Sequence, residues 1–259
     1  MKKQTEKPVA GHPSAVFVPC GQDAAAGEAL ARSLGLPCVR QQPAEGLFLQ
    51  WDAAGLSLRR GEQTLRGDFT KMLPRLRADR LAGELLVRAA KCKNQPAPVA
   101  VDATAGLGED AFLLAAAGMT VYLYEYDPIV AALLRDALRR AAEDPVLAAV
   151  AARMHLTPQD SVAALPHLPF TPDVVYLDPM FPRRTKNAQV KNKPQMLQLL
   201  QGPCAREEEL FRAAVQAHPR KIVVKRTPKG PWLAGVKPSY AITGKTVRFD
   251  CILMTDPTP

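Results

Sequence analysis

Short apolar runs alternate with longer amphipathic segments from residue 99 onward, and this alternation constrains the fold more than any other feature of the chain. Consecutive strand and helix units predict an α/β domain with a mostly parallel, twisted sheet and right-handed crossovers. Two strand-like runs flanking Gly244 and Lys245 predict a C-terminal antiparallel hairpin. The expected strands are 99–103, 121–124, 154–156, 174–177 and 222–225, the expected helices are 108–117, 128–142, 207–217 and a short one after Asp160, and the hairpin strands are 240–243 and 246–254.

The residues before this region follow a different pattern of shorter elements. Asp23 is placed as the N-cap of a helix, and Gly35 is placed as its C-terminal stop. We therefore expect a small N-terminal α/β domain at 1–70, a basic helical connector at 71–95 and a main domain at 96–259. The elements expected in the small domain are strands at 15–18 and 38–39, a helix at 23–34, and a hairpin of 47–51 with 56–59.

The composition argues against several classes of protein. No window approaches the roughly 18 consecutive apolar residues of a transmembrane helix, and the basic N-terminus lacks the apolar core of a secretory signal. The five cysteines are scattered, form no CxxC pair and lie apart in sequence from the four histidines, which argues against a disulfide framework and a metal site. We expect a cytoplasmic protein with no membrane partner and no metal.

Positive charge is concentrated at the two ends of the chain. Residues 1–95 carry 15 Lys and Arg against 9 Asp and Glu, residues 96–180 carry 4 against 11, and residues 181–259 carry 15 against 5. The net charge of +9 therefore combines an acidic centre with two basic flanks. This segregation is typical of a chain that holds an anionic polymer over a differently charged pocket, although basic flanks without a partner remain the alternative.

A glycine-containing turn is expected between the first strand and the first helix of the main domain. Asp102 ends the strand, and Gly106 and Gly108 follow where the backbone turns tightly and approaches a ligand. Glu125 ends the next strand, where a carboxylate can accept hydrogen bonds from both hydroxyls of a ribose. These positions predict a nucleoside-containing ligand at the carboxyl ends of the strands.

Two kinds of ligand suit this turn, and a third interpretation needs none. The two glycines and Ala111 fit the spacing of the dinucleotide-binding pattern, which would indicate a nicotinamide oxidoreductase. Asp102, Glu109 and Asp110 favour a cationic ligand instead, because acids at a helix N-terminus oppose a pyrophosphate. The sulfonium and ammonium groups of S-adenosylmethionine tolerate these acids, so we expect that cofactor. The remaining alternative is a tight turn without a ligand.

Asp160 and Ser161 follow the third strand. At this place in such folds, an Asp can accept a hydrogen bond from the exocyclic amine of an adenine. The same pair is equally typical of a helix N-cap. Both interpretations stay open at this point.

The fourth strand ends in Asp178-Pro179-Met180-Phe181, which we interpret as the acceptor site. The lone pair of an exocyclic base amine is delocalised into the ring, and a carboxylate held against its N–H favours attack on a methyl group. Asp178 is the candidate for that role, and Phe181 is the candidate for stacking on the base. The alternative is an N-cap aspartate with a phenylalanine in the core.

A basic run leaves this turn and contains no acid over eleven residues. Such a run is usually a solvated loop, but next to a catalytic turn it favours contact with phosphates. Lys225 and Arg226, at the end of the fifth strand, are expected on the same rim. The basic residues of the run are Arg183, Arg184, Lys186, Lys191 and Lys193.

Together these segments resemble the ribosomal RNA small subunit methyltransferase J family. The resemblance covers about 70–254 and is more specific than a match to class I (Rossmann-like) methyltransferases in general. The matching segments are 101–108, 110–112, Glu125, 130–134, 174–182, 223–226 and 248–250.

The resemblance implies a class I fold and S-adenosylmethionine-dependent methylation of a guanine N2 in the 16S rRNA of the small subunit. The chain departs from the family pattern in having Glu109 where Arg is usual, Tyr126 where a basic residue is usual, and Asp160 where Ser is usual. The donor contacts implied by the resemblance are Glu109, Asp110, Glu125, Tyr126, Asp160, Ser161 and Asp178.

Two other functions compete with this one. A nicotinamide-dependent oxidoreductase would use the same glycine turn, and a non-catalytic RNA-binding protein would use the same basic flanks. Asp178 and Glu125 favour the methyltransferase over the binding protein, because RNA binding alone requires neither carboxylate.

Overall fold

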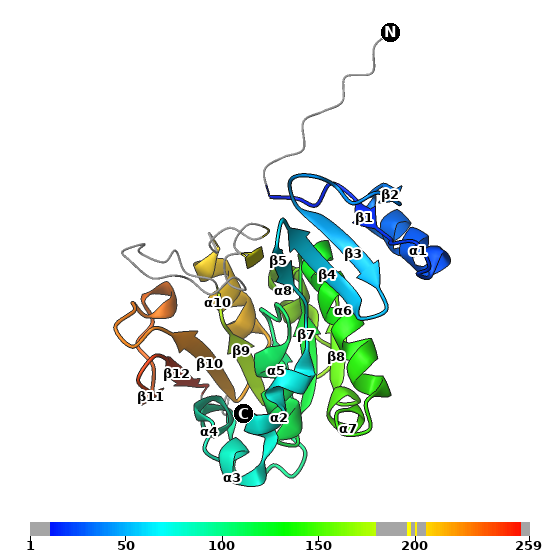
Figure 1. Cartoon of the computed structure of the whole chain (residues 1–259). Helices are drawn as coiled ribbons and strands as arrows, with labels where there is room; N and C mark the ends of the chain where they lie inside the picture. The colour runs from blue at the N-terminus through cyan, green and yellow to red at the C-terminus, as the bar shows by residue number, and fades with distance from the viewer. Residues whose placement is uncertain (1–10, 180–195, 198–199, 201–205, 255–259) are drawn as a thin grey trace. The chain divides into compact units, whose positions relative to one another are not determined.

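A computed structural model of the chain describes residues 11–179, 196–197, 200 and 206–254. The chain divides into two compact units, one formed by 1–67 with 183–202 and the other by 68–182 with 203–259 (Figure 1). Each unit contains its own β-sheet.

The smaller unit contains a five-stranded sheet in the order β2-β1-β3-β4-β5. Helix α1 begins after Asp23, whose side chain accepts a hydrogen bond from the Ala26 N–H, and ends at Gly35 in the left-handed conformation. The expected caps and the expected hairpin of β3 with β4 are confirmed, and β5 is an additional antiparallel strand. The elements are β1 Val16–Phe17, α1 Ala24–Leu34, β2 Cys38–Val39, β3 Phe48–Asp52, β4 Gly55–Arg60 and β5 Gln63–Leu65.

The basic segment that follows belongs to the larger unit. It forms four short helical pieces, and Ala82, Gly83 and Glu84 separate the last two. Leu86, Ala89 and Ala90 of the last piece are buried in the core of the larger unit. The pieces are η1 Phe69–Met72, α2 Leu73–Leu76, α3 Ala78–Leu81 and α4 Leu85–Ala90.

The larger unit is built on a seven-stranded sheet in the order β11-β12-β10-β9-β6-β7-β8. Strands β8, β7, β6, β9 and β10 are parallel, whereas β12 lies antiparallel between β10 and β11. The predicted α/β class, parallel sheet and C-terminal hairpin are confirmed. The strands are β6 Val99–Asp102, β7 Thr120–Tyr124, β8 Met154–Thr157, β9 Val174–Leu177, β10 Lys221–Arg226, β11 Tyr240–Thr243 and β12 Arg248–Leu253.

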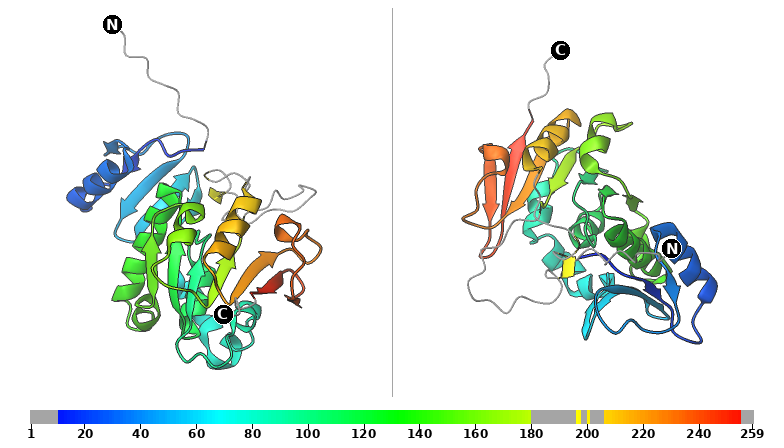
Figure 2. Two further views of the ribbon diagram at one scale, coloured as in Figure 1. Left: turned by 180° about the vertical axis from the view of Figure 1, so that it is seen from behind. Right: turned by 90° about the horizontal axis from the view of Figure 1, so that it is seen from above.

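Helices cover both faces of this sheet (Figures 1 and 2). One core packs the sheet against α4, α5 and α6, and the other packs it against α8 and α10. In the central strands β6, β7, β9 and β10, alternate residues face the two cores, as the period of two requires. The remaining helices are α5 Glu109–Ala116, α6 Pro128–Glu143, α7 Ala148–Ala151, α8 Ser161–Ala164, η2 Leu165–His167, α10 Glu207–Gln216 and η3 Leu233–Gly235.

The strand order reverses between β6 and β9, which are adjacent although other elements separate them in sequence. Connections therefore leave this point in opposite directions, and open α/β sheets place their ligands in the resulting crevice at the carboxyl ends of the strands. The carboxyl ends of β6 and β9 are Asp102 and Leu177. A ligand of this sheet is therefore expected at this edge.

Candidate active site

Strand register brings acidic and basic side chains together at the carboxyl edge. Asp102 of β6 pairs with Tyr176 of β9, and Leu177 pairs with Val224 of β10. Asp178 is the residue after Leu177, and Lys225 is the residue after Val224. Because side chains alternate between the two faces, both point to the face that α5 covers.

The turn after β6 has the conformation that its glycines predict. Gly106 has φ of 53° and Gly108 has φ of 75°, in the left-handed region. A Cβ atom on Gly108 would lie 2.7 Å from Cδ1 of Leu134 and 3.3 Å from Cζ of Phe69. Gly108 is therefore required both for its φ and for the close approach of the turn to the core.

Glu125 connects this turn to the end of β7. Its Oε2 accepts a hydrogen bond from the Gly106 N–H at 2.9 Å, and its Oε1 accepts one from the Asp127 N–H at 2.9 Å. These two bonds fix the carboxylate between the turn after β6 and the start of α6. Tyr126 is 63% exposed beside it. The predicted ribose contact remains a prediction.

Asp102 is the most deeply buried acid of the site. Its side chain is 1% exposed, and its Oδ1 accepts a hydrogen bond from the Thr104 N–H at 3.0 Å. Burial raises the pKa of Asp102 to about 8, and the nearby Asp110 and Asp178 add to this effect. A cation placed beside this carboxylate would stabilise its ionised form.

A chain of polar contacts links α5, β9 and β10. Oδ2 of Asp110 accepts hydrogen bonds from the Tyr176 hydroxyl and from Nζ of Lys225, both at 2.6 Å. Lys225 Nζ also lies 2.9 Å from Oδ2 of Asp178. Burial alone would lower the pKa of Lys225, but its two carboxylate partners raise it, so the lysine is charged.

Asp178 is held by its backbone as well as by its side chain. Its N–H donates to Oγ1 of Thr104 at 2.7 Å, which connects the end of β9 to the turn after β6. Burial raises the pKa of Asp178, Lys225 lowers it, and Asp110 raises it further. The acceptor candidate Asp178 and the donor turn therefore form one site. Neither Thr104 nor Tyr176 was predicted as a site residue from the sequence.

The structure places Asp160 as the N-cap of α8. Its Oδ1 accepts a hydrogen bond from the Val162 N–H at 2.9 Å, and its Oδ2 lies 2.8 Å from Nη1 of Arg206. The N-cap interpretation is thus confirmed. Ser161 follows and is buried. Recognition of an adenine by these residues remains a prediction.

Lys225 and Arg226 separate onto opposite faces of β10. Arg226 is buried, and its Nη2 lies 3.3 Å from Oε2 of Glu207 at the start of α10. Lys225 contacts Asp110 and Asp178 as described. These positions favour structural and site roles over the phosphate contact expected for both residues, and they arise because neighbouring residues of a strand face opposite sides.

The remaining predicted residues lie outside the part of the chain that the structure describes. They are Phe181 and the basic residues Arg183, Arg184, Lys186, Lys191 and Lys193.

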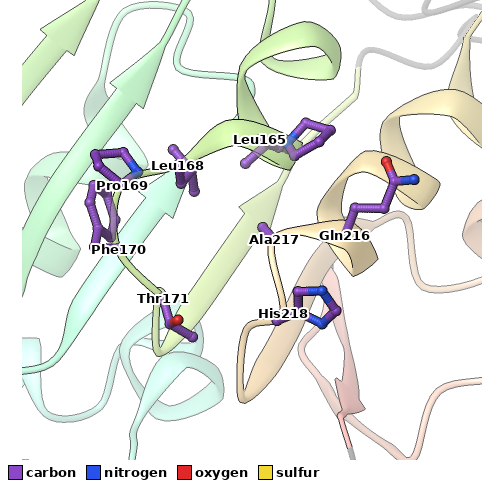
Figure 3. A pocket seen from close by; sticks show the side chains of 9 residues that line it. Leu165, Leu168, Pro169, Phe170, Thr171, Gln216, Ala217 and His218 are labelled. Atoms are coloured by element: carbon purple, nitrogen blue, oxygen red, sulfur yellow. The ribbon is translucent and has the colours of Figure 1, made fainter.

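A separate cavity of about 250 Å³ lies near the amino ends of β9 and β10, at the edge opposite the site. Figure 3 shows that side chains of the segment after α8 and of the end of α10 line it. It contains no carboxylate among its lining residues, which are Leu165, Pro166, Leu168, Pro169, Phe170, Thr171, Gln216, Ala217 and His218.

Comparison with known proteins identifies the family. The family model described as a putative SAM-dependent methyltransferase matches residues 29–254. A protein named ribosomal RNA small subunit methyltransferase J from Thioalkalivibrio sulfidiphilus (strain HL-EbGR7) is 43% identical over 232 residues, covering 86% of this chain and 91% of that protein. The chain belongs to this family of methyltransferases.

Other relatives of the methyltransferase agree. A protein of the same name from Neisseria gonorrhoeae is 40% identical over 230 residues, covering 86% of this chain and 91% of that protein. The crystal structure of a SAM-dependent methyltransferase from Neisseria gonorrhoeae superposes with a TM-score of 0.74 at 34% identity, covering 92% of this chain and 96% of that one. The class I fold, the enzymatic nature and the S-adenosylmethionine cofactor predicted from the sequence are thereby confirmed, and an oxidoreductase is not favoured.

The residues at the turn fit this cofactor. The raised pKa of the buried Asp102 marks a carboxylate that a positive charge would stabilise, and the donor carries a sulfonium and an ammonium group. Glycines at 106 and 108 bring the backbone to the same place. The donor-binding residues of the methyltransferase are proposed from this agreement.

Two further findings concern membranes and metals. Over residues 11–179 and 206–254, none of the helices has both the length and the apolar character that crossing a bilayer requires. In the same part of the chain, His, Cys, Asp and Glu side chains form no group of three or more that is suited to a metal ion.

Proposed function

We propose that this methyltransferase transfers a methyl group to the exocyclic N2 of a guanine in 16S rRNA of the small ribosomal subunit. The observation that carries the proposal is the connection of Asp178 to the donor turn through the 2.7 Å hydrogen bond to Thr104. The names of the relatives support ribosomal RNA of the small subunit as substrate. The choice of guanine N2 rests on the family resemblance.

Asp102, the turn through Gly106 and Gly108, and Glu125 would hold the donor. Bound S-adenosylmethionine supplies an electrophilic methyl group, which the amine nitrogen takes up as the carbon–sulfur bond breaks. Asp102 would face its positive charge, and Glu125 would bind the ribose hydroxyls. Holding donor and acceptor in one crevice accounts for much of the rate, because the reacting groups no longer need to meet by diffusion.

Asp178 would accept a hydrogen bond from the N–H of the base. This contact localises the nitrogen lone pair for attack, and the carboxylate takes the proton as the new carbon–nitrogen bond forms. Lys225 balances the negative charge of Asp178 before the proton arrives. Asp178 and Lys225 together would thus provide for removal of the proton from the base amine.

The basic flanks would bind the phosphates of the RNA substrate. The segment 181–259 carries 15 Lys and Arg against 5 Asp and Glu, and phosphate contacts supply sequence-independent affinity. The proposed rRNA substrate supports the cytoplasmic location expected from the sequence.

The decisive experiment compares Asp178→Ala with the wild type. Tritium transfer from labelled S-adenosylmethionine to small ribosomal subunits lacking the modification should fall by about 10²–10⁴-fold. Donor affinity measured by calorimetry should fall much less than the rate of methyl transfer, since the turn through Gly106 and Gly108 is intact. Nucleoside mass spectrometry should identify N2-methylguanosine in the wild-type product.

Asp173→Ala is the matched control. Asp173 precedes the same strand at its opposite end, where Oδ2 accepts a hydrogen bond from the Val99 N–H at 2.8 Å. Its loss should leave methyl transfer near the wild-type rate. Full activity of Asp178→Ala would remove Asp178 from catalysis, and salt-sensitive RNA binding without any methylated product would favour a non-catalytic RNA-binding protein.

A further inference from the structure

Lys225 is the cation that contacts both Asp110 and Asp178 in the acidic site. Its Nζ lies 2.6 Å from Oδ2 of Asp110 and 2.9 Å from Oδ2 of Asp178. The Lys225 side chain is 31% exposed, so this ion pair is partly buried. Distances this short indicate charge-assisted hydrogen bonds.

Acidic and basic groups near Asp178 act on the pKa of its carboxyl in opposite directions. Asp110, on α5, raises the pKa of the Asp178 carboxyl, and Asp110 and Asp178 both raise the pKa of Asp102 on β6. Lys225 and Arg226 favour the charged form of Asp178 from β10, but Arg226 lies on the opposite face and pairs with Glu207. Tyr176 lies on β9, just before Asp178, and its hydroxyl donates a hydrogen bond to Asp110.

We propose that Lys225 is a positioning residue for methyl transfer, which fixes the Asp178 carboxylate through Oδ2 and keeps it ionised beside the other acids. This inference rests on the proposed function of Asp178. Among the described residues, Lys225 binds Oδ2 of Asp178, and Oδ1 then serves the amine of the base. Asp110 in turn holds the lysine, and Tyr176 holds Asp110.

This role differs from contact with the RNA backbone. A phosphate-binding lysine contributes to substrate affinity and to its dependence on salt. A lysine that holds the catalytic carboxylate acts on kcat and on its pH dependence, because an opposite charge within about 4–6 Å favours the ionised form of a carboxyl. The two roles therefore predict different kinetic changes.

The test measures kcat and KM against pH for Lys225→Met, which keeps the length of the side chain and removes its charge. We expect kcat at about pH 7 to fall at least about tenfold, and the acid limb of the profile to move up by about one pH unit or more. Activity should recover as the pH rises. Lys225→Arg keeps the charge and should keep the wild-type acid limb.

Asp110→Asn gives a second measurement, in which the acid limb of the pH profile should move in the opposite direction. Asp110 raises the pKa of Asp178, so its neutralisation should move the acid limb to lower pH at saturating donor. A general loss of structure does not shift the two variants in opposite directions. This arm keeps the proposal testable should Lys225→Met fail to fold.

Lys221→Met is the matched control on the same strand. Nζ of Lys221 donates to the carbonyl oxygens of Ala89 and Lys91, both at 2.9 Å, at the other end of β10. Its loss should leave the position of the acid limb unchanged. An unchanged acid limb in Lys225→Met, or a rise in KM for rRNA with constant kcat, would overturn the role of Lys225. Absence of methyl transfer by the wild type would instead remove the proposed function itself.

Discussion

Replacing Asp102 by Asn tests whether the buried carboxylate at the end of β6 resists ionisation. The side chain is 1% exposed, and its pKa rises from 3.8 to about 8 because burial penalises the charged form. Asparagine keeps an oxygen that can accept the Thr104 N–H, and it does not titrate. The variant therefore separates the effect of charge from that of the hydrogen bond.

The magnitude follows from proton linkage. Between pH 3.8 and about 8, the folded protein holds about one more proton at Asp102 than the unfolded chain does. The free energy of unfolding consequently falls by about 1.4 kcal/mol for each unit of rising pH. Between about pH 5 and pH 7 the wild type should lose about 2.5 kcal/mol that the variant keeps.

Urea unfolding followed by circular dichroism at about pH 5, 6, 7 and 8 measures this difference. The free energy of unfolding of Asp102→Asn minus that of the wild type should increase by about 2.5 kcal/mol from pH 5 to pH 7. It should level off above about pH 8, where the carboxylate is ionised in both states. Parallel curves for the two proteins would refute the raised pKa of Asp102.

Two further substitutions test the supports of the site. Gly108→Ala should lower the free energy of unfolding by about 1–3 kcal/mol and weaken donor binding in calorimetry, because its Cβ would lie 2.7 Å from Cδ1 of Leu134 at a φ of 75°. Wild-type stability and affinity would contradict this expectation. Asp127→Ala should cost about 1 kcal/mol in urea unfolding, since the side chain caps α6 through the N–H groups of Ile129 and Val130; an unchanged midpoint would show that the cap is dispensable.

Elements with local signals were predictable from the sequence. Asp23 and Gly35 determine where α1 begins and ends through contacts within a few residues, and apolar runs locate the strands of the larger sheet. Strand β5 was missed because its three residues contain a single apolar side chain, Leu65. The basic segment was predicted as helical and is helical in several short pieces; Gly83 lies between two of them, and residues of the last piece are buried in the larger core.

The sequence was sufficient to predict which acidic residues belong to the candidate site. It did not predict which side chains contact one another there. Spacing from the glycine turn located Asp102, and strand ends located Glu125 and Asp178. Lys225 and Arg226 were expected together on the rim because both are basic and both lie at the end of the fifth strand. Their alternation along a buried strand was the signal that separates them, since the lysine follows the residue paired with Leu177 and the arginine faces the opposite core.

The segregation of charge in the sequence acquires a physical reason at the carboxyl edge. The acidic centre supplies Asp102, Asp110 and Asp178 to the partly buried carboxyl edge of the sheet, where negative charge is costly unless it is paired. One pairing group, Lys225, comes from the basic C-terminal segment, and the donor adds its own positive charge. The substrate RNA has the opposite requirement, because its phosphates need cations. A surface of uniform charge would bind one of these ligands and repel the other, so an acidic centre between basic flanks suits an enzyme that must hold both at once.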